Sequence, residues 1–520
     1  MVIKNYIMKE SYYDSVLLMR LAGEAGKLPG VSNISVGMGT PLNKDTIQEL
    51  GLLLPEGEKA TPNDLIIALS AETDETAEKI RASFLQMLKD NQSPKGKRSY
   101  PSLDSMKTAV RDRNLAVISL AGQYAAAEAE KALKMGMNVF MFSDNVPIEE
   151  EVKLKTYARE QGLLMMGPDC GLSFIGGVAV GLCSKVRRGG VGLIGACGSG
   201  MQEVMNIVHL LGGGVSQAIG VGGRDLRREV GGLTMLTALD LLEADEETKV
   251  IGLISKPPAP ETAEKIFDRV RHCKKPVVAQ FIHCDPTLAA QSGAQVSNSF
   301  EETALRCLAI LKEKEYIPEA EQDRLNRLLP LAKEEAAGMA KSQKYLRGLY
   351  CGGSLAEETI TLGTGLLGSM YGNVAFQEEY MLSDPHQSKG NCLIDLGAEE
   401  FTLGKPHVAI DPSPRLSRFV QEARDPETAV ILMDFLLGYA LCEDPAGMIA
   451  PLIKEEKARA LQEGRKLSVV AAFCGSDLDP QNRIAQEKIL RDAGAIVMGN
   501  NGEASRLAAL IASVQGGKNE

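Results

Sequence analysis

Residues 191–200 read VGLIGACGSG, and they lead directly into MQEVMNIV at residues 201–208. A short apolar run, a glycine-rich turn and an apolar pattern of helical period describe a strand that delivers the chain to the start of a helix. The first N–H groups of a helix lack intrahelical partners and carry the positive end of the helix dipole. The stretch therefore predicts a site for a phosphate or a carboxylate. Its residues are Gly195, Cys197, Gly198, Ser199 and Gly200.

This turn is open to two further interpretations. It could be a dinucleotide fingerprint, because Asp225 follows the next strand where an acid that binds ribose would stand. The spacing of its three glycines is not G-x-G-x-x-G, however. The turn could also serve only tight packing of strand and helix. Within the anion site, the Ser199 hydroxyl could bind the ligand, and Cys197 would be reactive only if its pKa were lowered.

Composition excludes several classes of protein. The 520 residues are 44% hydrophobic and 24% charged, as in an ordinary globular chain of three or four domains. The net charge is -11 and the basic residues are scattered, so no nucleic-acid footprint is present. The chain lacks an apolar run of about 18 residues and its start lacks the apolar region of a signal peptide. We expect a cytoplasmic protein with no membrane span.

Ten cysteines occur one at a time, without a C-x-x-C pair. This pattern argues against a disulfide framework and against a zinc site, so we predict buried thiols and no metal site.

Short apolar runs alternate with helical patterns along the chain, which is typical of α/β proteins with mainly parallel sheets. We expect several Rossmann-like or flavodoxin-like domains. The predicted boundaries give an amino-terminal α/β unit at 1–98, a Rossmann domain at 99–186, a flavodoxin-type domain at 187–316, a connecting helix at 317–344 and a carboxy-terminal α/β domain at 345–520. In the first unit, strands are predicted at 2–6, 32–36 and 64–69, helices at 11–25 and 45–53, and a polar linker at 89–102. Later strands are predicted at 115–120, 138–142, 162–166, 215–221, 250–254, 276–282, 347–350, 392–395, 429–433, 468–473 and 495–498.

The ends of two predicted strands supply further polar groups. Gly222, Gly223 and Arg224 follow one strand, and Lys256 follows the next. In a parallel sheet these ends share the edge where ligands bind. Arg224 could reach the same anion with a forked pair of donors, although a surface position in a loop fits its sequence context equally well. We predict catalytic roles for Arg224 and Lys256.

The carboxy-terminal domain repeats the pattern. Gly352, Gly353 and Ser354 follow a strand and open a helix, which makes a second candidate site at a helix start. Another strand leads into a loop that is dense in polar groups, and such loops are often functional. This loop adds Asp395, Gly397 and His407 to the candidates, with a catalytic role for the histidine. His209 lies in an apolar helical pattern and is expected in the core.

These motifs resemble succinyl-CoA synthetase. GPDCG at 167–171, the Gly195 turn, GVGG at 220–223 and KPVV at 275–278 occur in the order found in its α subunit. The carboxy-terminal half of its β subunit is similar to the stretch from residue 345, through CGG, LIDLG and LMDF at 351–353, 393–397 and 432–435. A single chain of this arrangement resembles the FdrA family, most specifically through ISKPPAP at 254–260 and GGRDL at 222–226. The resemblance implies CoA-binding-like and ligase-like α/β domains.

The chain departs from the synthetase where the synthetase handles ATP. Its phosphoryl-carrying His-Ala-Gly-Ala motif is replaced by QSGA at Gln291–Ala294. The region that grasps ATP has no counterpart between Ile310 and Tyr345, and Val36–Thr40 matches the CoA-phosphate loop poorly. We therefore expect that this chain alone is not an ATP-driven CoA ligase.

FdrA-type proteins are similar to the large subunit of a carbamoyltransferase in purine-ureide (allantoin) breakdown, which works with two further subunits. That enzyme interconverts oxalurate and phosphate with oxamate and carbamoyl phosphate. The resemblance thus implies phosphate or carbamoyl phosphate at the helix starts, an oxamate-type acid as co-substrate, two partner subunits and scope for a homo-oligomer. Two alternatives stay open. One is an acyl-CoA synthetase or CoA-binding protein, with CoA as cofactor and a partner for ATP use, and the other is a scaffold subunit without catalysis.

Overall fold

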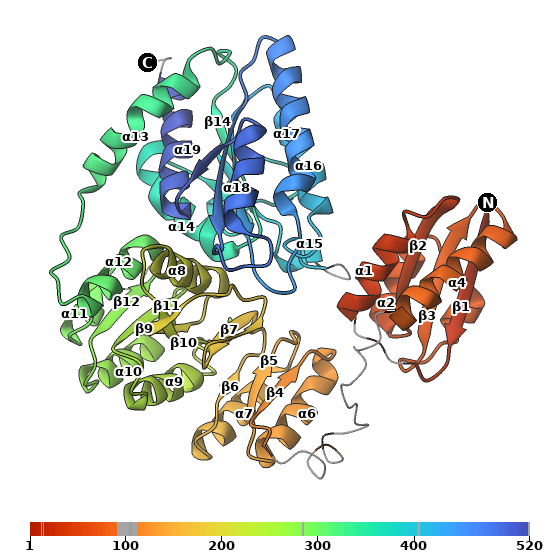
Figure 1. Cartoon of the computed structure of the whole chain (residues 1–520), viewed down its shortest axis with the longest axis horizontal. Coiled ribbons are helices and arrows are strands. Elements are labelled where there is room, and N and C mark those ends of the chain that lie inside the picture. The colour runs from red at the N-terminus through yellow and green to blue at the C-terminus, as the bar shows by residue number, and fades with distance from the viewer. Residues whose placement is uncertain are drawn as a thin grey trace. The chain divides into compact units, whose positions relative to one another are not determined.

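The computed structural model describes residues 1–11, 13, 15–90, 103, 106, 112–282, 285–402 and 406–517, apart from the side chains of residues 15, 16 and 42. These residues form two compact units (Figure 1). The smaller unit comprises Met1–Arg111 and Glu399–Pro406, and the larger unit comprises Asp112–Ala398 and His407–Glu520.

The smaller unit is a three-stranded sheet with helices on both faces. Its central strand, β3 (Leu65–Ala71), is buried along its whole length, because alternate side chains enter two different apolar clusters. Leu65, Ile67 and Leu69 pack with two helices on one face, whereas Ile66 and Ala68 pack toward the other face. The elements are β1 (Val2–Met8), α1 (Ser15–Ala25), β2 (Val31–Met38), α2 (Pro41–Glu49), α3 (Pro55–Glu58), β3 (Leu65–Ala71), α4 (Asp74–Asp90) and α15 (Glu399–Thr402).

The prediction of mainly parallel sheets is wrong for this unit. The strand order is β1-β3-β2, and both pairings are antiparallel. A strand buried on both faces reads as a continuous apolar run, which parallel and central antiparallel strands share. The helix predicted at 45–53 begins earlier, because Thr40 caps α2 and Pro41 opens it. The predicted linker lies outside the described residues, apart from the end of α4.

The larger unit begins with a small parallel sheet of order β4-β5-β6. Its elements are β4 (Leu115–Ile118), α6 (Gly122–Lys134), β5 (Asn138–Met141), α7 (Ile148–Glu160) and β6 (Met165–Met166). The predicted strand-helix alternation is present here, with shorter strands than predicted.

The second sheet has seven strands in the order β13-β12-β11-β9-β10-β7-β8. The five from β13 to β10 are parallel, whereas the hairpin of β7 and β8 adds antiparallel strands at one edge. The predicted domain boundary at 186 assigns this hairpin to the preceding domain, yet β7 pairs with β10. The elements are β7 (Leu172–Ile175), β8 (Val178–Gly181), β9 (Arg188–Gly195), α8 (Gly198–Leu210), β10 (Val215–Gly220), α9 (Leu233–Ala244), β11 (Val250–Ser255), α10 (Pro260–Arg271), β12 (Val277–Phe281), α11 (Pro286–Gln291), β13 (Gln295–Val296) and α12 (Phe300–Leu311).

The third sheet is fully parallel, with the order β15-β16-β14-β17-β18-β19. Helix α13 (Glu321–Ala336) lies between the second and third sheets in the chain, within the range 317–344 where a connecting helix is expected. The remaining elements are β14 (Tyr345–Tyr350), α14 (Gly353–Leu367), β15 (Tyr371–Gly372), the 3-10 helix η1 (Glu378–Tyr380), β16 (Cys392–Asp395), α16 (Ser413–Arg424), β17 (Thr428–Leu436), α17 (Pro445–Gln462), β18 (Ser468–Cys474), α18 (Arg483–Asp492), β19 (Ile496–Met498) and α19 (Asn501–Gly516). The chain is thus α/β, with three mainly parallel sheets in the larger unit.

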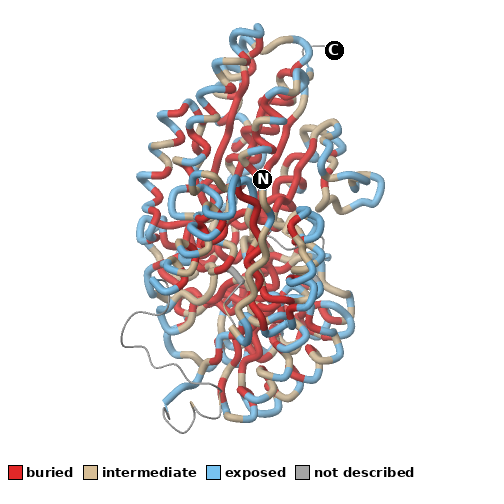
Figure 2. Tube along the Cα trace, turned by 90° about the vertical axis from the view of Figure 1, so that its right-hand side faces the viewer, coloured by how far each residue is buried: buried red, intermediate tan, exposed pale blue. Residues whose placement is uncertain are grey.

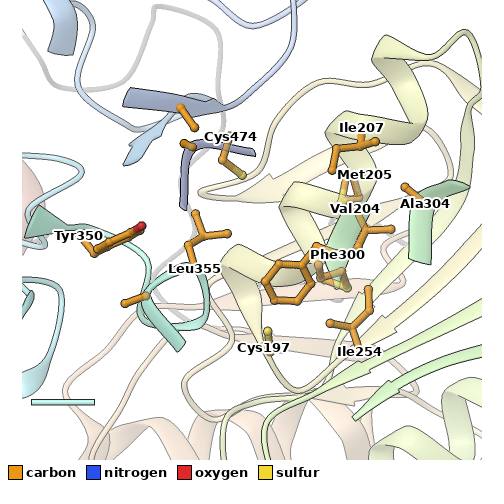
Figure 3. Packing of buried hydrophobic residues seen from close by; sticks show 14 of the residues in the cluster. Cys197, Val204, Met205, Ile207, Ile254, Phe300, Ala304, Tyr350, Leu355 and Cys474 are labelled. Carbon is orange, nitrogen blue, oxygen red and sulfur yellow. The ribbon is translucent and has the colours of Figure 1, made fainter. Parts of the chain in front are cut away.

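One apolar cluster joins the second and third sheets. Phe300 and the inner face of α8 pack in it together with Leu355 of α14 (Figure 3). Figure 2 shows that the strands are buried, while the outer turns of many helices are exposed. Hydrogen bonds cross the same junction, including one of 2.9 Å from the Ser184 hydroxyl to the Leu437 carbonyl. Helix α8 supplies His209 to this junction, and the side chain is buried as predicted. The packing fixes α8 against α14.

Candidate functional site

A cavity of about 450 Å³ lies between the carboxyl ends of strands from the second and third sheets. Every predicted site residue lines it, with the exception of Gly200. These lining residues are Gly195, Cys197, Gly198, Ser199, Gly222, Gly223, Arg224, Lys256, Gly352, Gly353, Ser354, Asp395, Gly397 and His407. The structure therefore brings together residues that lie up to about 200 positions apart in the sequence, because parallel strands end at the same edge.

The start of α8 forms one wall of the cavity. Cys197 precedes the helix in an extended conformation (φ −151°, ψ 101°), and no side chain caps the helix. Gly198 is exposed and Ser199 is partly exposed. The N–H groups of these two residues have no hydrogen-bond partner among the residues that the structure describes. The helix start thus presents free donors to the cavity.

The start of α14 forms the facing wall. The buried Asp434 carboxylate accepts hydrogen bonds from the N–H groups of Cys351 (2.7 Å) and Gly352 (2.9 Å), which fixes the turn before the helix. Burial raises the pKa of Asp434 above its usual value, although Arg415 and these donors oppose the shift. The next two N–H groups, of Gly353 and Ser354, have no partner within the described part of the chain.

The two helix starts touch each other. A Cβ atom at Gly352 would lie 2.7 Å from the Cβ of Ser199, closer than real Cβ atoms come, so only glycine permits this approach. The Ser354 side chain also lies close enough to the Cys197 thiol to influence its pKa. The positive ends of both helix dipoles therefore act on the same small volume, which favours an anion there.

Lys256 and two carboxyl groups set the charge of the cavity. Desolvation opposes the charge of Lys256, but its 2.9 Å ion pair with Glu357 and other nearby acidic groups outweigh it and raise its pKa. The ammonium group therefore stays protonated. Burial raises the pKa of Asp395 to about 7, even though its carboxylate accepts a hydrogen bond from the Gly397 N–H and lies near Lys256. Near neutral pH the cavity thus contains the charged Lys256 ammonium group, and the Asp395 carboxyl group can take up a proton.

Arg224 is bound differently from our prediction. Its Nη2 group donates to the Val146 carbonyl (2.8 Å) and pairs with the buried Glu151 (2.9 Å), so one arm of the predicted fork is already engaged. Arg227 lines the same cavity and is exposed. Among the described residues, its side chain has no hydrogen-bond or ion-pair partner. Arg227 was not predicted from the sequence. The run of basic residues after Gly223 is the sequence feature that could have indicated it.

His407 and Cys197 are both uncharged at neutral pH. Burial and the nearby Arg415 lower the pKa of His407 to about 4. The Ala409 N–H donates to its Nδ1 (3.1 Å), so the ring proton resides on Nε2, next to Gly397. Burial raises the pKa of the Cys197 thiol to about 11, so the condition for a reactive thiol at this helix start is not met.

Two residues have structural roles instead of the predicted ones. Gly200 lies beneath the cavity wall, where an added Cβ would be 2.5 Å from both Cys197 Sγ and the Phe300 ring. Asp225 is fully buried, and it binds Lys155 (2.7 Å) and the N–H groups of Thr234 and Met235 at the start of α9. It cannot reach a ribose, so the dinucleotide interpretation is wrong at this residue.

Two acidic residues of the site, Asp169 and Glu357, were not predicted from the sequence either. Asp169 lies on the cavity wall after β6, and Glu357 is the partner of Lys256. Asp169 could have been found by its place at a strand end, like Lys256. Glu357 lies inside a helix, where the sequence gives no sign that it pairs with a residue of the cavity.

Three family models match parts of the chain. They are described as AllF, heavy metal-associated domain (residues 1–102), CoA binding domain (186–283) and CoA-ligase (349–511). Residues 1–102 contain no cysteine and no histidine, so this match comes without the thiolate and imidazole groups that commonly bind transition-metal ions. Among the described residues, no group of three or more His, Cys, Asp or Glu side chains is placed to hold a metal ion.

One relative defines the family of the whole chain. The chain is 42% identical to the uncharacterized protein YahF of Escherichia coli strain K12, over 98% of both chains. The chain belongs to the YahF family. It is also 29% identical to the α subunit 2 of succinate–CoA ligase from Archaeoglobus fulgidus, over 34% of this chain and 62% of that subunit. The family is therefore succinyl-CoA synthetase-like, while membership of the FdrA family stays a prediction.

A solved structure with a weak likeness is the dinucleotide-forming acetyl-coenzyme A synthetase 1 of Candidatus Korarchaeum cryptofilum, in complex with phosphate and ADP. Its TM-score is 0.36 at 15% identity, over 82% of this chain and 88% of that one. A score this low does not bear on function. Within the described part of this chain, no helix has the length and apolar composition needed to cross a membrane.

Proposed function

We propose that the larger unit binds phosphate and acyl phosphates and takes part in acyl transfer between phosphate and an acceptor. The observation that carries this proposal is the meeting of two uncapped helix starts in one cavity, with Lys256 on its wall. Backbone N–H groups that already point at the anion need no rearrangement as charge develops on it. The free donors also argue against a scaffold whose old ligand site is filled.

The chemistry follows from where the charge moves. When an acyl group leaves an acyl phosphate, the bond between the acyl carbon and the phosphate oxygen breaks, and negative charge develops on that oxygen. The free N–H groups at Gly198, Ser199, Gly353 and Ser354 and the Lys256 ammonium would stabilise this charge. The Cys197 thiol is uncharged, Nδ1 of His407 accepts from the Ala409 N–H and Nε2 carries the ring proton, so the proposed transfer is direct, without a covalent intermediate on either residue.

Two reactions fit this site. The matches to CoA-binding and CoA-ligase models and to ligase α subunits support an acyl-CoA synthetase that needs a partner for ATP use. When bound, CoA supplies a thiol as the acyl acceptor. The replacement of the phosphoryl-carrying histidine by the sequence at Gln291–Ala294, together with the FdrA resemblance, supports carbamoyl transfer between phosphate and an oxamate-type acid, with two partner subunits.

Titration calorimetry on the full chain separates these reactions. We expect inorganic phosphate to bind in both cases. Carbamoyl transfer predicts that carbamoyl phosphate binds and that CoA gives no heat, whereas acyl-CoA synthesis predicts that CoA binds. No binding of any of the three ligands would refute the proposal.

Two neighbouring arginines provide a matched control for that titration. Arg227 lines the cavity, whereas Arg228 pairs with Glu261 and does not line it. Arg227→Ala should weaken phosphate binding about 3- to 5-fold, as expected for one exposed cation. Arg228→Ala should leave the affinity unchanged. Equal effects of the two variants would place the anion away from Arg227.

A further inference from the structure

Asp169 is a cavity residue that phosphate binding does not use. It follows β6 in the loop Gly167–Gly171, and its backbone N–H donates to the Ser143 carbonyl (3.0 Å). The backbone is left-handed at this residue (φ 54°), a conformation that few residues other than glycine, asparagine and aspartate adopt. A Cβ at Gly223 would lie 3.0 Å from Asp169 Oδ2, so the glycine leaves room for the carboxylate.

The Asp169 carboxylate is the acid of this wall that has no fixed partner. It is exposed to the cavity, and no hydrogen bond or ion pair of its oxygens occurs among the described residues. The other acids of the site are engaged. Asp434 holds the turn before α14, Glu357 pairs with Lys256, and Asp395 accepts from the Gly397 N–H.

The surrounding charges keep Asp169 close to a change of protonation. Partial desolvation is the largest influence on the pKa of Asp169, and it raises this pKa. The carboxylates of Asp144 and Glu151 raise the pKa further, whereas Lys256 and Arg224 lower it. The net effect raises the pKa of Asp169 to about 6. It is therefore ionised at pH 7 to 8 and basic enough to accept a proton during a reaction.

We propose that Asp169 is the general base of the acyl transfer, and that it takes the proton from the acceptor nucleophile. This inference rests on the proposed function, but it holds for an amide or a thiol acceptor alike. The N–H or S–H proton moves to an Asp169 oxygen, and the electron pair of that bond forms the new bond to the acyl carbon. The bond from that carbon to the phosphate oxygen then breaks, and its electron pair leaves with the phosphate. The proton on Asp169 returns to solvent when the products leave.

The experiment uses the full chain assembled with its partner subunits. Phosphate release is followed with carbamoyl phosphate and oxamate, and with acetyl phosphate and CoA, from about pH 5 to about pH 8.5. The wild type should lose activity below about pH 6, as Asp169 becomes protonated. Asp169→Asn should lower kcat by about 10²- to 10⁴-fold and remove this acidic limb, without weakening phosphate binding in calorimetry. Asparagine also tolerates the left-handed backbone, so the fold should persist.

Asp144→Asn is the matched control. Asp144 is exposed and raises the pKa of Asp169, so its removal should keep the activity and move the acidic limb to lower pH. The inference is overturned if Asp169→Asn keeps its rate within about 3-fold or keeps the acidic limb. A wild type that neither binds phosphate nor turns over either substrate pair refutes the proposed function itself, and the role of Asp169 with it.

Discussion

At the scale of single residues, the cavity joins groups that attract an anion with two carboxyl groups, Asp169 and Asp395, that respond to pH. Lys256 stays charged, whereas Asp395 has a pKa of about 7. Below that pH Asp395 is neutral and does not oppose an anion at the start of α14. Above it, the carboxylate repels the anion.

Anion binding should therefore weaken as the pH rises through about 7. Sulfate is the suitable ligand, because its own charge is constant over the range. By linkage, the affinity should fall by up to about tenfold per pH unit above the pKa of Asp395, and Asp395→Asn should flatten this dependence. Calorimetric titrations from about pH 5.5 to about pH 8.5 measure the effect. An unchanged slope in the variant would exclude Asp395 as its source.

At the scale of elements, the glycines of the turn before α8 have two different roles, one in packing and one in leaving the cavity side open. Gly200 packs against Phe300, while a Cβ at Gly198 would have Leu172 as its nearest neighbour at 3.9 Å. The turn thus combines close packing on its inner side with open space on its cavity side. Packing and anion binding therefore both account for this turn, at different glycines.

Alanine substitutions should separate these two roles. Gly200→Ala should destabilise the larger unit by about 1 to 3 kcal/mol, because the core must shift to admit a methyl group. Gly198→Ala should be neutral or stabilising by up to about 1 kcal/mol, since alanine favours the helix. Urea unfolding followed by circular dichroism gives both values. A Gly200→Ala variant as stable as the wild type would contradict the packing seen at Phe300.

At the scale of the whole molecule, the sequence predicted the alternation of strands and helices and about half of the cavity lining, including both helix starts. It did so because polar residues at the ends of parallel strands gather at one edge, wherever they lie in the chain. It did not predict the antiparallel order of the first sheet, since a run such as Leu65–Ala71 reads alike in both kinds of sheet. The sequence also did not predict which side chains pair with one another. The commitment of Arg224 to Glu151 depends on α7, which is distant in sequence.

The central claim is that free N–H groups at two helix starts hold a phosphate, and Gly198 allows a direct test. It is the first residue of α8, and Cys197 before it is extended, so proline fits there without breaking the helix. Gly198→Pro removes one free N–H group, whereas Gly198→Ala keeps it. In calorimetric titration of the full chain with inorganic phosphate, Gly198→Ala should match the wild type and Gly198→Pro should bind about tenfold more weakly, as expected for one hydrogen bond to a charged group. Equal phosphate affinity in the two variants would contradict the claim.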